Sequence, residues 1–405
     1  MYLERQLESK FLKMSSFFKA ILVVGARQVG KTTMLKHLSK DRTYVSLDDF
    51  ATLQLAKTDP KLFFMRFKPP IIIDEVQKAP ELFPYIKILC DETDKTGLFW
   101  LTGSEQYAMM QNITESLAGR VAIMTLYPFS FNELNGVRFD KPIDFSAEAL
   151  MEREKTAKPF NLDGIFDFIW KGGMPQVQWA DEEQRSVYFS SYINTYLMRD
   201  VTTAGKITDE IRFIKFLTAC ASNVSQLLNL SNLAMIAEIS QPTAKSWLAL
   251  LERLNIIYLL SPYSNNKIKR LTKQPKLYFW DTGLCSYLAK WLTKDTLLCG
   301  NAAGYYFENL VVTELIKDLE YNSVNYNLCY YRDSNNKEID LFLEYANEIH
   351  PLEIKLSASP DVREVKKYSV LDTNSLSRGK GGIVCMSPNV LPIDKDNCFI
   401  PVNVI

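Results

Sequence analysis

Residues 19–33 read Lys-Ala-Ile-Leu-Val-Val-Gly-Ala-Arg-Gln-Val-Gly-Lys-Thr-Thr. The apolar run at residues 21–24 predicts a buried strand, and a loop from Gly25 to Gly30 follows it. The segment matches the pattern Gly-x-x-x-x-Gly-Lys-Ser/Thr without departure. Such a loop turns successive backbone N–H groups inward and leads into a helix N-terminus, which together attract an anion. The sequence therefore predicts a phosphate-binding loop between a strand and a helix.

Each residue type in this loop has a chemical task. Glycine at positions 25 and 30 permits backbone torsions that a Cβ would forbid. Lys31 is expected to reach the β- and γ-phosphates, and the Thr32 hydroxyl to ligate magnesium. ATP and Mg²⁺ are therefore the expected cofactors. The loop residues predicted to contact the nucleotide are Gly25, Ala26, Arg27, Gln28, Val29, Gly30, Lys31, Thr32 and Thr33.

A second half of the same site is predicted at residues 69–75, Pro-Pro-Ile-Ile-Ile-Asp-Glu. Three β-branched residues indicate a short buried strand that ends in two carboxylates. In phosphate-loop enzymes one acid holds magnesium through water and the next polarises the attacking water. Asp74 fits the first role and Glu75 the second. Acids in such a place also cap the helix that follows, but their position after a complete phosphate loop favours the catalytic interpretation.

A third strand is predicted at residues 98–101, followed by Thr102, Gly103 and Ser104. A polar residue here would lie between the two earlier strands and sense the γ-phosphate. Thr102 and Ser104 are both candidates. Ser104 fits the N-cap of a following helix equally well.

Residues 116–120 read Ser-Leu-Ala-Gly-Arg and precede a strand-like run at residues 121–124. Here the sequence resembles AAA+ ATPases, within a large and poorly characterised prokaryotic group. The resemblance implies that Arg120 is an arginine finger that reaches the γ-phosphate of a neighbouring subunit, and hence a homo-oligomer. Such fingers supply ~10³ to 10⁵ in rate. An ordinary surface arginine is the alternative.

Length and composition set limits on the remaining chain. A length of 405 residues predicts two or three domains. The formal net charge is zero, so any affinity for nucleic acid must come from a local surface. The chain has two histidines and no Cys-x-x-Cys, which argues against a zinc site and a disulfide framework. We expect no signal peptide, no transmembrane helix and a cytoplasmic location.

Residues 207–280 predict a winged helix-turn-helix. Helices are expected at 211–220, at 232–237 and from Ser240, and strands at 256–260 and 276–280. Polar side chains of the third helix would point outward, namely Gln241, Thr243, Lys245 and Ser246. The hairpin tip carries four basic residues without an acid between them, Lys267, Lys269, Arg270 and Lys273. Such a wing suits DNA phosphates, but winged helices in AAA+ chains also serve only to pack on neighbours.

A second chemistry is predicted in residues 301–370. Glu308 lies on a helix from about 303 to 319, and strands are expected at 328–332, 338–343 and 351–355. Residues two apart on a strand share a face, so Glu353 and Lys355 project together and Asp340 can meet them from the adjacent strand. Two acids and a lysine around magnesium can hydrolyse a phosphodiester.

This arrangement resembles the PD-(D/E)xK nuclease fold. The resemblance implies that Asp340, Glu353 and Lys355 are catalytic and that Glu308, Asp340 and Glu353 bind the metal, beside Thr32 and Asp74 in the nucleotide site. The literal Pro-Asp is absent, because Ile339 precedes Asp340. Alternating acids on an exposed strand are common, and such a fold also persists with an idle metal site, so both alternatives stay open.

The expected fold class is α/β. A parallel P-loop NTPase sheet comes first, followed by a helical and winged-helix region and an α/β restriction-endonuclease-like domain. The expected domains are an AAA+ P-loop ATPase domain at 1–135, a linker and helical lid at 136–206, a winged helix-turn-helix at 207–282 and a nuclease-like domain at 283–405.

Two functions follow from this organisation. One is a DNA-associated ATPase with a tethered magnesium-dependent nuclease. The other is a nucleotide-dependent regulator or scaffold whose nuclease-like domain is inactive and binds a protein partner. A small-molecule kinase is a third and weaker hypothesis, because no acceptor domain is evident.

Overall fold

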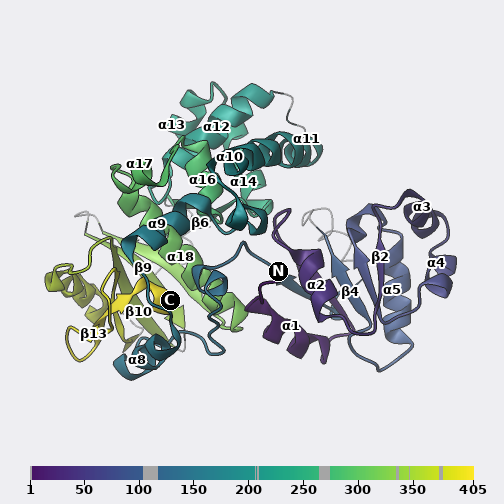
Figure 1. Ribbon diagram of the computed structural model, residues 1–405, viewed down its shortest axis with the longest axis horizontal. Helices are drawn as coiled ribbons and strands as arrows, with labels where there is room; N and C mark the ends of the chain where they lie inside the picture. Colours follow the sequence, from purple (N-terminus) through teal and green to yellow (C-terminus); the bar gives the residue numbers. More distant parts are fainter. Residues whose placement is uncertain are drawn as a thin grey trace. The chain divides into compact units, whose positions relative to one another are not determined.

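The computed structural model describes residues 2–103, 117–205, 207, 209–263, 274–333, 337–345, 347–373 and 377–405. The chain forms two compact units, Met1–Pro128 with Arg253–Asn255, and Phe129–Glu252 with Ile256–Ile405. The first unit is drawn mainly in purple and blue, and the second in teal to yellow (Figure 1). Among the described residues, no helix combines the length and apolar character needed to cross a membrane.

A five-stranded parallel sheet forms the middle of the first unit, with strand order β2-β3-β4-β1-β5. The parallel α/β sheet predicted from the sequence is thus confirmed. Because the strands run in one direction, the loops that follow β1, β3 and β4 meet at the same edge. The strands are β1 (Ala20–Val24), β2 (Thr43–Ser46), β3 (Ile71–Asp74), β4 (Phe99–Thr102) and β5 (Val121–Thr125).

Helices cover both faces of this sheet. Alternate residues of β1, such as Leu22, join one core cluster with Phe83 and Ile86 of α5. On the opposite face, the ring of Phe11 in α1 meets Trp100 edge to face, with 4.8 Å between centroids. The helical elements are α1 (Leu7–Ser15), α2 (Lys31–Leu38), α3 (Phe50–Thr58), α4 (Pro60–Arg66), η1 (Val76–Lys78) and α5 (Leu82–Asp91).

The second unit begins with a helical region. The Gly-Gly turn at its centre is a close approach: Gly172 has φ +81°, and a Cβ there would lie 2.4 Å from Asp281 Oδ1. The next amide, of Gly173, donates to Asp281 Oδ2 over 2.7 Å. The elements are α7 (Phe131–Leu134), α8 (Ala147–Thr156), α9 (Leu162–Lys171), η2 (Pro175–Trp179), α10 (Glu182–Ser191), the π-helix η3 (Tyr192–Leu197) and α11 (Met198–Gly205).

The segment expected to be a linker contains helix α8, which contacts strand β14 of the C-terminal sheet. Arg153 of α8 donates to Val404 O over 2.8 Å and forms an ion pair with Asp318 at 2.9 Å. The two side chains are 10% and 5% exposed, so this pair is buried. Part of the segment predicted as a linker is therefore a helix that is held on the C-terminal part of the unit.

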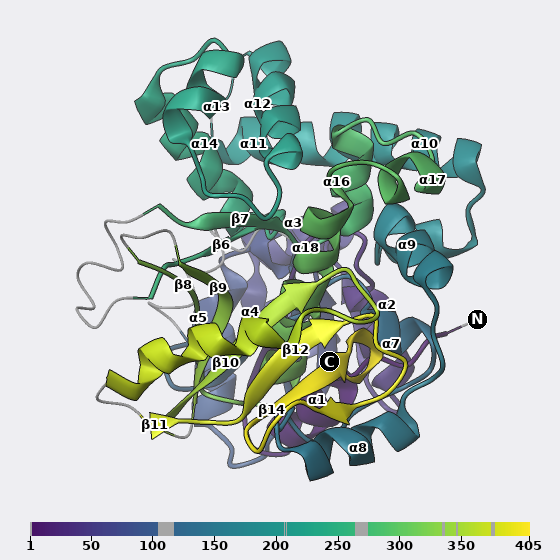
Figure 2. The ribbon, with the colours of Figure 1, turned by 90° about the vertical axis from the view of Figure 1, so that its left-hand side faces the viewer.

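Three helices and a two-stranded antiparallel hairpin follow, at the places that the sequence predicts. Figure 2 shows α12, α13 and α14 gathered above the hairpin. The hairpin tip with Lys267, Lys269, Arg270 and Lys273 lies outside the described residues. The elements are α12 (Glu210–Ser222), α13 (Leu230–Ile236), α14 (Gln241–Arg253), β6 (Ile257–Leu260), β7 (Lys276–Phe279), α16 (Thr282–Leu288) and α17 (Lys294–Leu298).

A mixed sheet closes the chain, with strand order β13-β14-β12-β10-β9-β8 and β11 beside β10. Strands β8, β9 and β10 are antiparallel neighbours, whereas β12 and β14 run parallel to β10. The strands predicted at 328–332, 338–343 and 351–355 are thus confirmed. They are β8 (Asn327–Arg332), β9 (Glu338–Tyr345), β10 (Glu348–Lys355), β11 (Ser377–Arg378), β12 (Gly381–Cys385), β13 (Leu391–Pro392) and β14 (Asn397–Pro401), with the 3₁₀ segments η4 (Val362–Thr373) and η5 (Val402–Val404).

Helix α18 (Ala303–Tyr321) joins the parts of this unit. Most of its side chains are buried, which is unusual for a helix that carries several charges. Near its start, Asn309 exchanges two hydrogen bonds with the backbone of Phe279 in β7, at 2.7 and 2.9 Å. Further along, Glu314 accepts from the amide of Phe131 over 2.8 Å. The same helix therefore holds the hairpin, the start of the unit and the mixed sheet.

Candidate functional site

The phosphate loop lies at the carboxyl edge of the parallel sheet, between β1 and α2. Gly25 has φ +141°, and a Cβ there would come within 2.2 Å of Leu126 O. Gly30 has φ +99° and Gln28 has φ +63°, so the loop turns through several left-handed positions. Lys31 Nζ donates to the carbonyls of Gly25 and Ala26, at 3.0 and 2.8 Å. The lysine thus lies folded over the loop that it is predicted to serve.

Asp74 gathers three hydroxyl groups around its carboxylate. Thr32 Oγ1 donates to Oδ1 over 2.8 Å, and Thr102 Oγ1 donates to the same oxygen. Tyr44 donates to Oδ2 over 2.7 Å. Strand order explains the meeting, because β4 lies between β1 and β3. Carboxylate and hydroxyl oxygens are the ligands that magnesium takes in such sites, so the donor set of Thr32 and Asp74 fits the ion.

Glu75 leaves the strand at an abrupt turn, with φ 58° and ψ 45°. Its amide donates to Thr102 Oγ1 over 3.3 Å, and Gln77 Nε2 donates to its Oε2. The Thr102 hydroxyl therefore contacts both acids, as acceptor from Glu75 and donor to Asp74. Non-glycine residues with a left-handed backbone conformation are often found at functional sites. The activation of water by Glu75 remains a prediction.

The other residues predicted to contact the nucleotide differ in burial. Ala26 and Val29 are buried, and Thr33 is exposed on α2. Ser104 lies outside the described residues, so its competing roles stay open. The structure thus brings together Thr32, Asp74 and Thr102 of the predicted set.

Two residues of this site were missed in the sequence. Tyr44 is the first, through its bond to Asp74. The second is Arg5, whose guanidinium donates to Val29 O of the loop at 2.9 Å and to Tyr127 O at 2.6 Å. Arg5 is 2% exposed. Neither residue has a sequence signal of its own, because each reaches the site from an element distant in the chain.

Arg120 lies at the opposite edge of the sheet from the phosphate loop. Its carbonyl accepts from Ala20 N over 3.3 Å, at the start of β1, whereas the loop follows the end of β1. Its guanidinium forms a two-pronged pair with Asp91 at the end of α5, at 2.6 and 3.0 Å. The pair raises the pKa of Arg120 and lowers that of Asp91. The arginine is thus remote from the nucleotide site of its own chain.

The second candidate site is a cluster of acids in the second unit. It also contains a lysine that the sequence pattern did not place there. Lys276 Nζ lies 3.0 Å from Glu308 Oε1, 2.7 Å from Glu338 Oε1 and 3.7 Å from Asp340 Oδ1. The Tyr278 hydroxyl also donates to Glu308 Oε1, over 2.7 Å. The lysine comes from β7, Glu308 from α18 and the other acids from β9.

Asp340 and Glu353 face the same side of the sheet on adjacent strands, as predicted. Leu341 pairs with Leu352, which places Asp340 beside Glu353. Asp340 Oδ2 accepts from Ile354 N over 2.8 Å. Glu353 Oε1 accepts from Lys355 at 2.7 Å and from Lys367 at 3.0 Å, whereas its buried Oε2 has no hydrogen-bond partner.

Burial and mutual repulsion raise the pKa values of two acids in this cluster. Burial, with Asp340 adding to it, raises the pKa of Glu308 to about 7 and that of Glu353 to about 7. Burial disfavours the charged form of Lys276, but Glu308, Asp340 and Glu338 more than compensate and its pKa is raised. Among the residues that the structure describes, no group of three or more His, Cys, Asp or Glu side chains is arranged to hold a metal ion. Metal binding by Glu308, Asp340 and Glu353 therefore stays a prediction.

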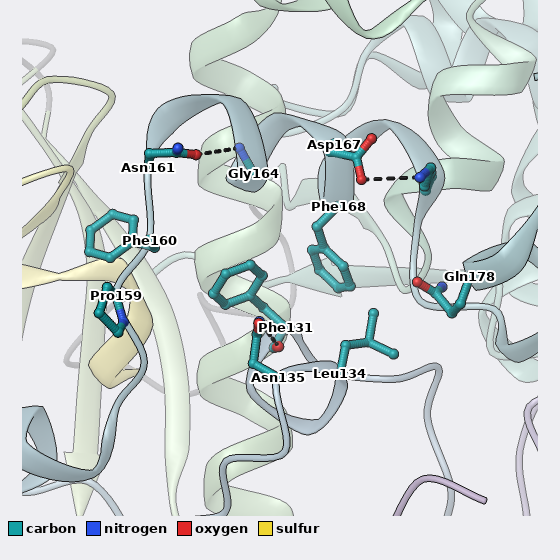
Figure 3. A pocket seen from close by; sticks show the side chains of 11 residues that line it. Phe131, Leu134, Asn135, Pro159, Phe160, Asn161, Gly164, Asp167, Phe168 and Gln178 are labelled. Atoms are coloured by element: carbon teal, nitrogen blue, oxygen red, sulfur yellow. Dashed lines mark hydrogen bonds and ion pairs between the residues drawn. The ribbon is translucent and has the colours of Figure 1, made fainter. Parts of the chain in front are cut away.

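A cavity of about 400 Å³ lies elsewhere in the second unit, between α7 and α9 (Figure 3). The rings of Phe131 and Phe168 meet edge to face in it, 5.7 Å apart. The charged residues of its wall, Asp167 and Lys171, pair with each other at 3.2 Å. This cavity includes none of the predicted site residues.

Residues 17–135 match the family model of an AAA domain. This segment is a P-loop ATPase domain. Residues 162–295 match a domain of unknown function, DUF8612, and residues 303–405 match another, DUF4143. The AAA match contains the phosphate loop, both acids and Arg120.

The ATPase is also similar to uncharacterized proteins. One from Mycobacterium tuberculosis is 26% identical over 355 residues, which is 87% of this chain and 74% of that protein. Another, from Haemophilus influenzae, is 23% identical over 272 residues, 65% of this chain and 60% of that protein. Among solved structures, a Walker-type ATPase of Pyrococcus abyssi matches with a TM-score of 0.43 and 16% identity, covering 71% of this chain and 96% of that one.

Proposed function

We propose that this ATPase works as an AAA+-type homo-oligomer in which Arg120 completes the nucleotide site of a neighbouring copy. The placement of Arg120 supports this best. A strand rises ~3.3 Å per residue, so the five residues of β1 set Arg120 on the order of 15 Å from its own phosphate loop. Contact with a γ-phosphate therefore requires a second copy. Release from Asp91, an exposed partner, costs little because surface ion pairs are weak.

The nucleotide site has residues for each step of phosphoryl transfer to water. Thr32 and Asp74 would hold Mg²⁺, which neutralises charge on the phosphates. Lys31 exchanges the carbonyls of Gly25 and Ala26 for phosphate oxygens. Glu75 orients and deprotonates the attacking water, and the Thr102 hydroxyl keeps the two acids in register.

DNA association is the second part of the proposal. Support comes from the order of three helices and a hairpin, as in a winged helix, and from the exposed polar face of α14 with Gln241, Lys245 and Ser246. Acids lie close to that face: Asp209 and Glu238 line a cavity of about 590 Å³ with Ser246. They pair with Arg212 and Lys215, which makes this surface a weak attractor of phosphate.

For the C-terminal domain, two candidate functions remain, a magnesium-dependent nuclease and a regulator that binds a protein and cuts nothing. The topology of α18 and strands β8 to β12 is compatible with a PD-(D/E)xK domain. The acids that would hold metal are already occupied, since Lys276 contacts Glu308 and Asp340, and two lysines contact Glu353. The geometry therefore supports the regulator better.

A cleavage experiment separates these two candidates. Linear, supercoiled and branched DNA would be incubated with Mg²⁺ or Mn²⁺, with and without ATP. Wild type would be compared with Asp340→Ala and Lys31→Ala. We expect ATP hydrolysis by wild type and by Asp340→Ala, none by Lys31→Ala, and no cleavage by any of them. Cleavage that disappears in Asp340→Ala would instead establish the nuclease.

A further inference from the structure

We propose that Lys276 is a resident cation that takes the place of a divalent metal ion in the acid cluster of the second unit. The inference rests on the regulator function proposed above and names the residue that would make the domain independent of metal. Its basis is the position of the ammonium group among carboxylates from two different elements.

The contacts of Lys276 resemble those of an ion more than those of a surface lysine. Its ammonium lies within 3.0 Å of carboxylate oxygens from Glu308 and Glu338, and 3.7 Å from Asp340. The side chain is 5% exposed, and Glu308 and Asp340 are each 13% exposed. An ammonium that compensates several buried carboxylates performs the electrostatic task of a bound cation.

The backbone holds Lys276 in this position. It is the first residue of β7, where it pairs with Leu260 of β6. Next to it, the amide of Leu277 donates to Gln226 O over 3.2 Å, and two residues further Asn309 clasps Phe279. The anchored strand fixes the Cα of Lys276, and the burial of the side chain, which is 5% exposed, keeps the ammonium group in the cluster.

The remaining acids are also compensated. Arg332 lies 3.6 Å from Glu338, and Lys355 and Lys367 both contact Glu353. With Glu364, which Lys367 also contacts, the network contains five carboxylates and four basic side chains. The basic side chains of this network would repel a divalent ion unless it displaced them. The affinity for metal should therefore be low while Lys276 is present.

Neutralising Lys276 should therefore create a metal site. In Lys276→Gln, Glu308 and Asp340 would lose their ammonium partner, and with Glu338 they would surround a neutral polar group of similar size. Mn²⁺ titration of the nucleotide-free full chain by calorimetry should reveal a binding event at least 10-fold tighter than any shown by wild type. Mn²⁺ should also raise the thermal unfolding midpoint of Lys276→Gln but not that of wild type.

Two further variants assign the site. Adding Asp340→Asn to Lys276→Gln should abolish the new binding event, which separates it from ion binding near Asp74. The matched control is Lys355→Gln, which removes a positive charge from the same network but leaves Lys276 in place. It should acquire no comparable affinity.

Several results would overturn the inference. One is that wild type binds Mn²⁺ as tightly as Lys276→Gln does, and that this binding depends on Asp340. Another is that Lys276→Gln folds but does not acquire the new site. If Lys276→Gln fails to fold, Mn²⁺ in the refolding buffer should rescue it, and failure of rescue also counts against the inference. DNA cleavage by wild type would refute the regulator function, whereas absence of the new site in a protein that does not cleave would refute only the role of Lys276.

Discussion

The hydroxyl of Tyr44 donates to Asp74 Oδ2 over 2.7 Å, across adjacent strands of the parallel sheet. Lys36 Nζ lies over the Tyr44 ring, 3.6 Å from its centre, in a cation–π contact. Burial, reinforced by Asp74, raises the pKa of Tyr44, so the phenol stays protonated as a donor. Tyr44 therefore fixes the orientation of the acid predicted to hold magnesium.

Tyr44→Phe should weaken the use of magnesium without unfolding the protein. Loss of a group that orients a metal ligand typically costs 10–100-fold. We expect the magnesium concentration for half-maximal ATP turnover to rise about 10-fold. Tyr85→Phe, the same change in α5, should leave that concentration unchanged. Equal values for both variants would show that Tyr44 has no such role.

Arg120→Ala should bind ATP normally and hydrolyse it at least ~10³-fold more slowly, as expected for loss of an arginine finger. Asp91→Ala is the matched control, because it breaks the same ion pair but leaves the guanidinium. It should retain turnover. If both variants lose the same activity, the pair serves structure only.

Mixing inactive variants tests the trans arrangement. Arg120→Ala supplies an intact phosphate loop, and Lys31→Ala supplies an intact Arg120. Neither should turn over ATP alone, but an equimolar mixture should recover part of the wild-type rate. A mixture as inactive as its components would contradict a finger acting between copies.

Arg5→Lys should loosen the phosphate loop. Lysine cannot span the carbonyls of Val29 and Tyr127, so a buried acceptor loses its donor at a cost of about 1–3 kcal/mol in the free energy of unfolding. Urea unfolding measures this loss, and an ATP titration should show several-fold weaker binding. Lys13→Ala, on the exposed side of α1, should change neither quantity.

His350 should make the protein less stable in acid. Burial lowers the pKa of its ring below the ordinary 6.5, against opposing effects of the Lys380 carbonyl, Glu348 and Asp144. Nδ1 bonds to Lys380 O at 2.8 Å, and the buried Nε2 has no hydrogen-bond partner but lies 3.9 Å from Glu348 Oε2. Below pH 6.5 the unfolded chain takes up a proton before the folded chain does, so the free energy of unfolding falls until the folded pKa is passed.

His350→Asn should remove this contribution. Asparagine can still donate to Lys380 O but does not titrate. The free energy of unfolding, measured between about pH 7 and pH 5, should therefore fall less for the variant than for wild type. Parallel profiles across this range would contradict the assignment to His350.

The sequence predicted the features that depend on residues close together in the chain. The phosphate loop, the strand that ends at Asp74 and the C-terminal strands each follow from local patterns, and the structure contains them. Helix α14 begins next to Ser240, where the sequence predicts its start, and the Ser240 hydroxyl accepts from Thr243 N over 3.2 Å.

What the sequence could not predict are side chains whose partners depend on how distant segments pack. Arg5 reaches Val29 only because the segment before α1 lies beside the loop, and Tyr44 reaches Asp74 only because β2 pairs with β3. Lys276 was assigned to a strand of the hairpin, but α18 and β9 bring the acids to it. Composition and periodicity contain no information on these contacts between residues that are distant in the chain.

The buried charges of α18 limit which segments of the protein can be exchanged by recombination. Glu314 accepts from the amide of Phe131 and Asp318 from the amide of Ile143, while Asn309 bonds to the hairpin. A recombination event that exchanged the last hundred residues alone would separate these carboxylates from the backbone amides of Phe131 and Ile143 that donate to them. The region from Phe129 to the C-terminus should therefore have diversified as one block, and hybrid proteins should tolerate a junction before it far better than one near Ala303.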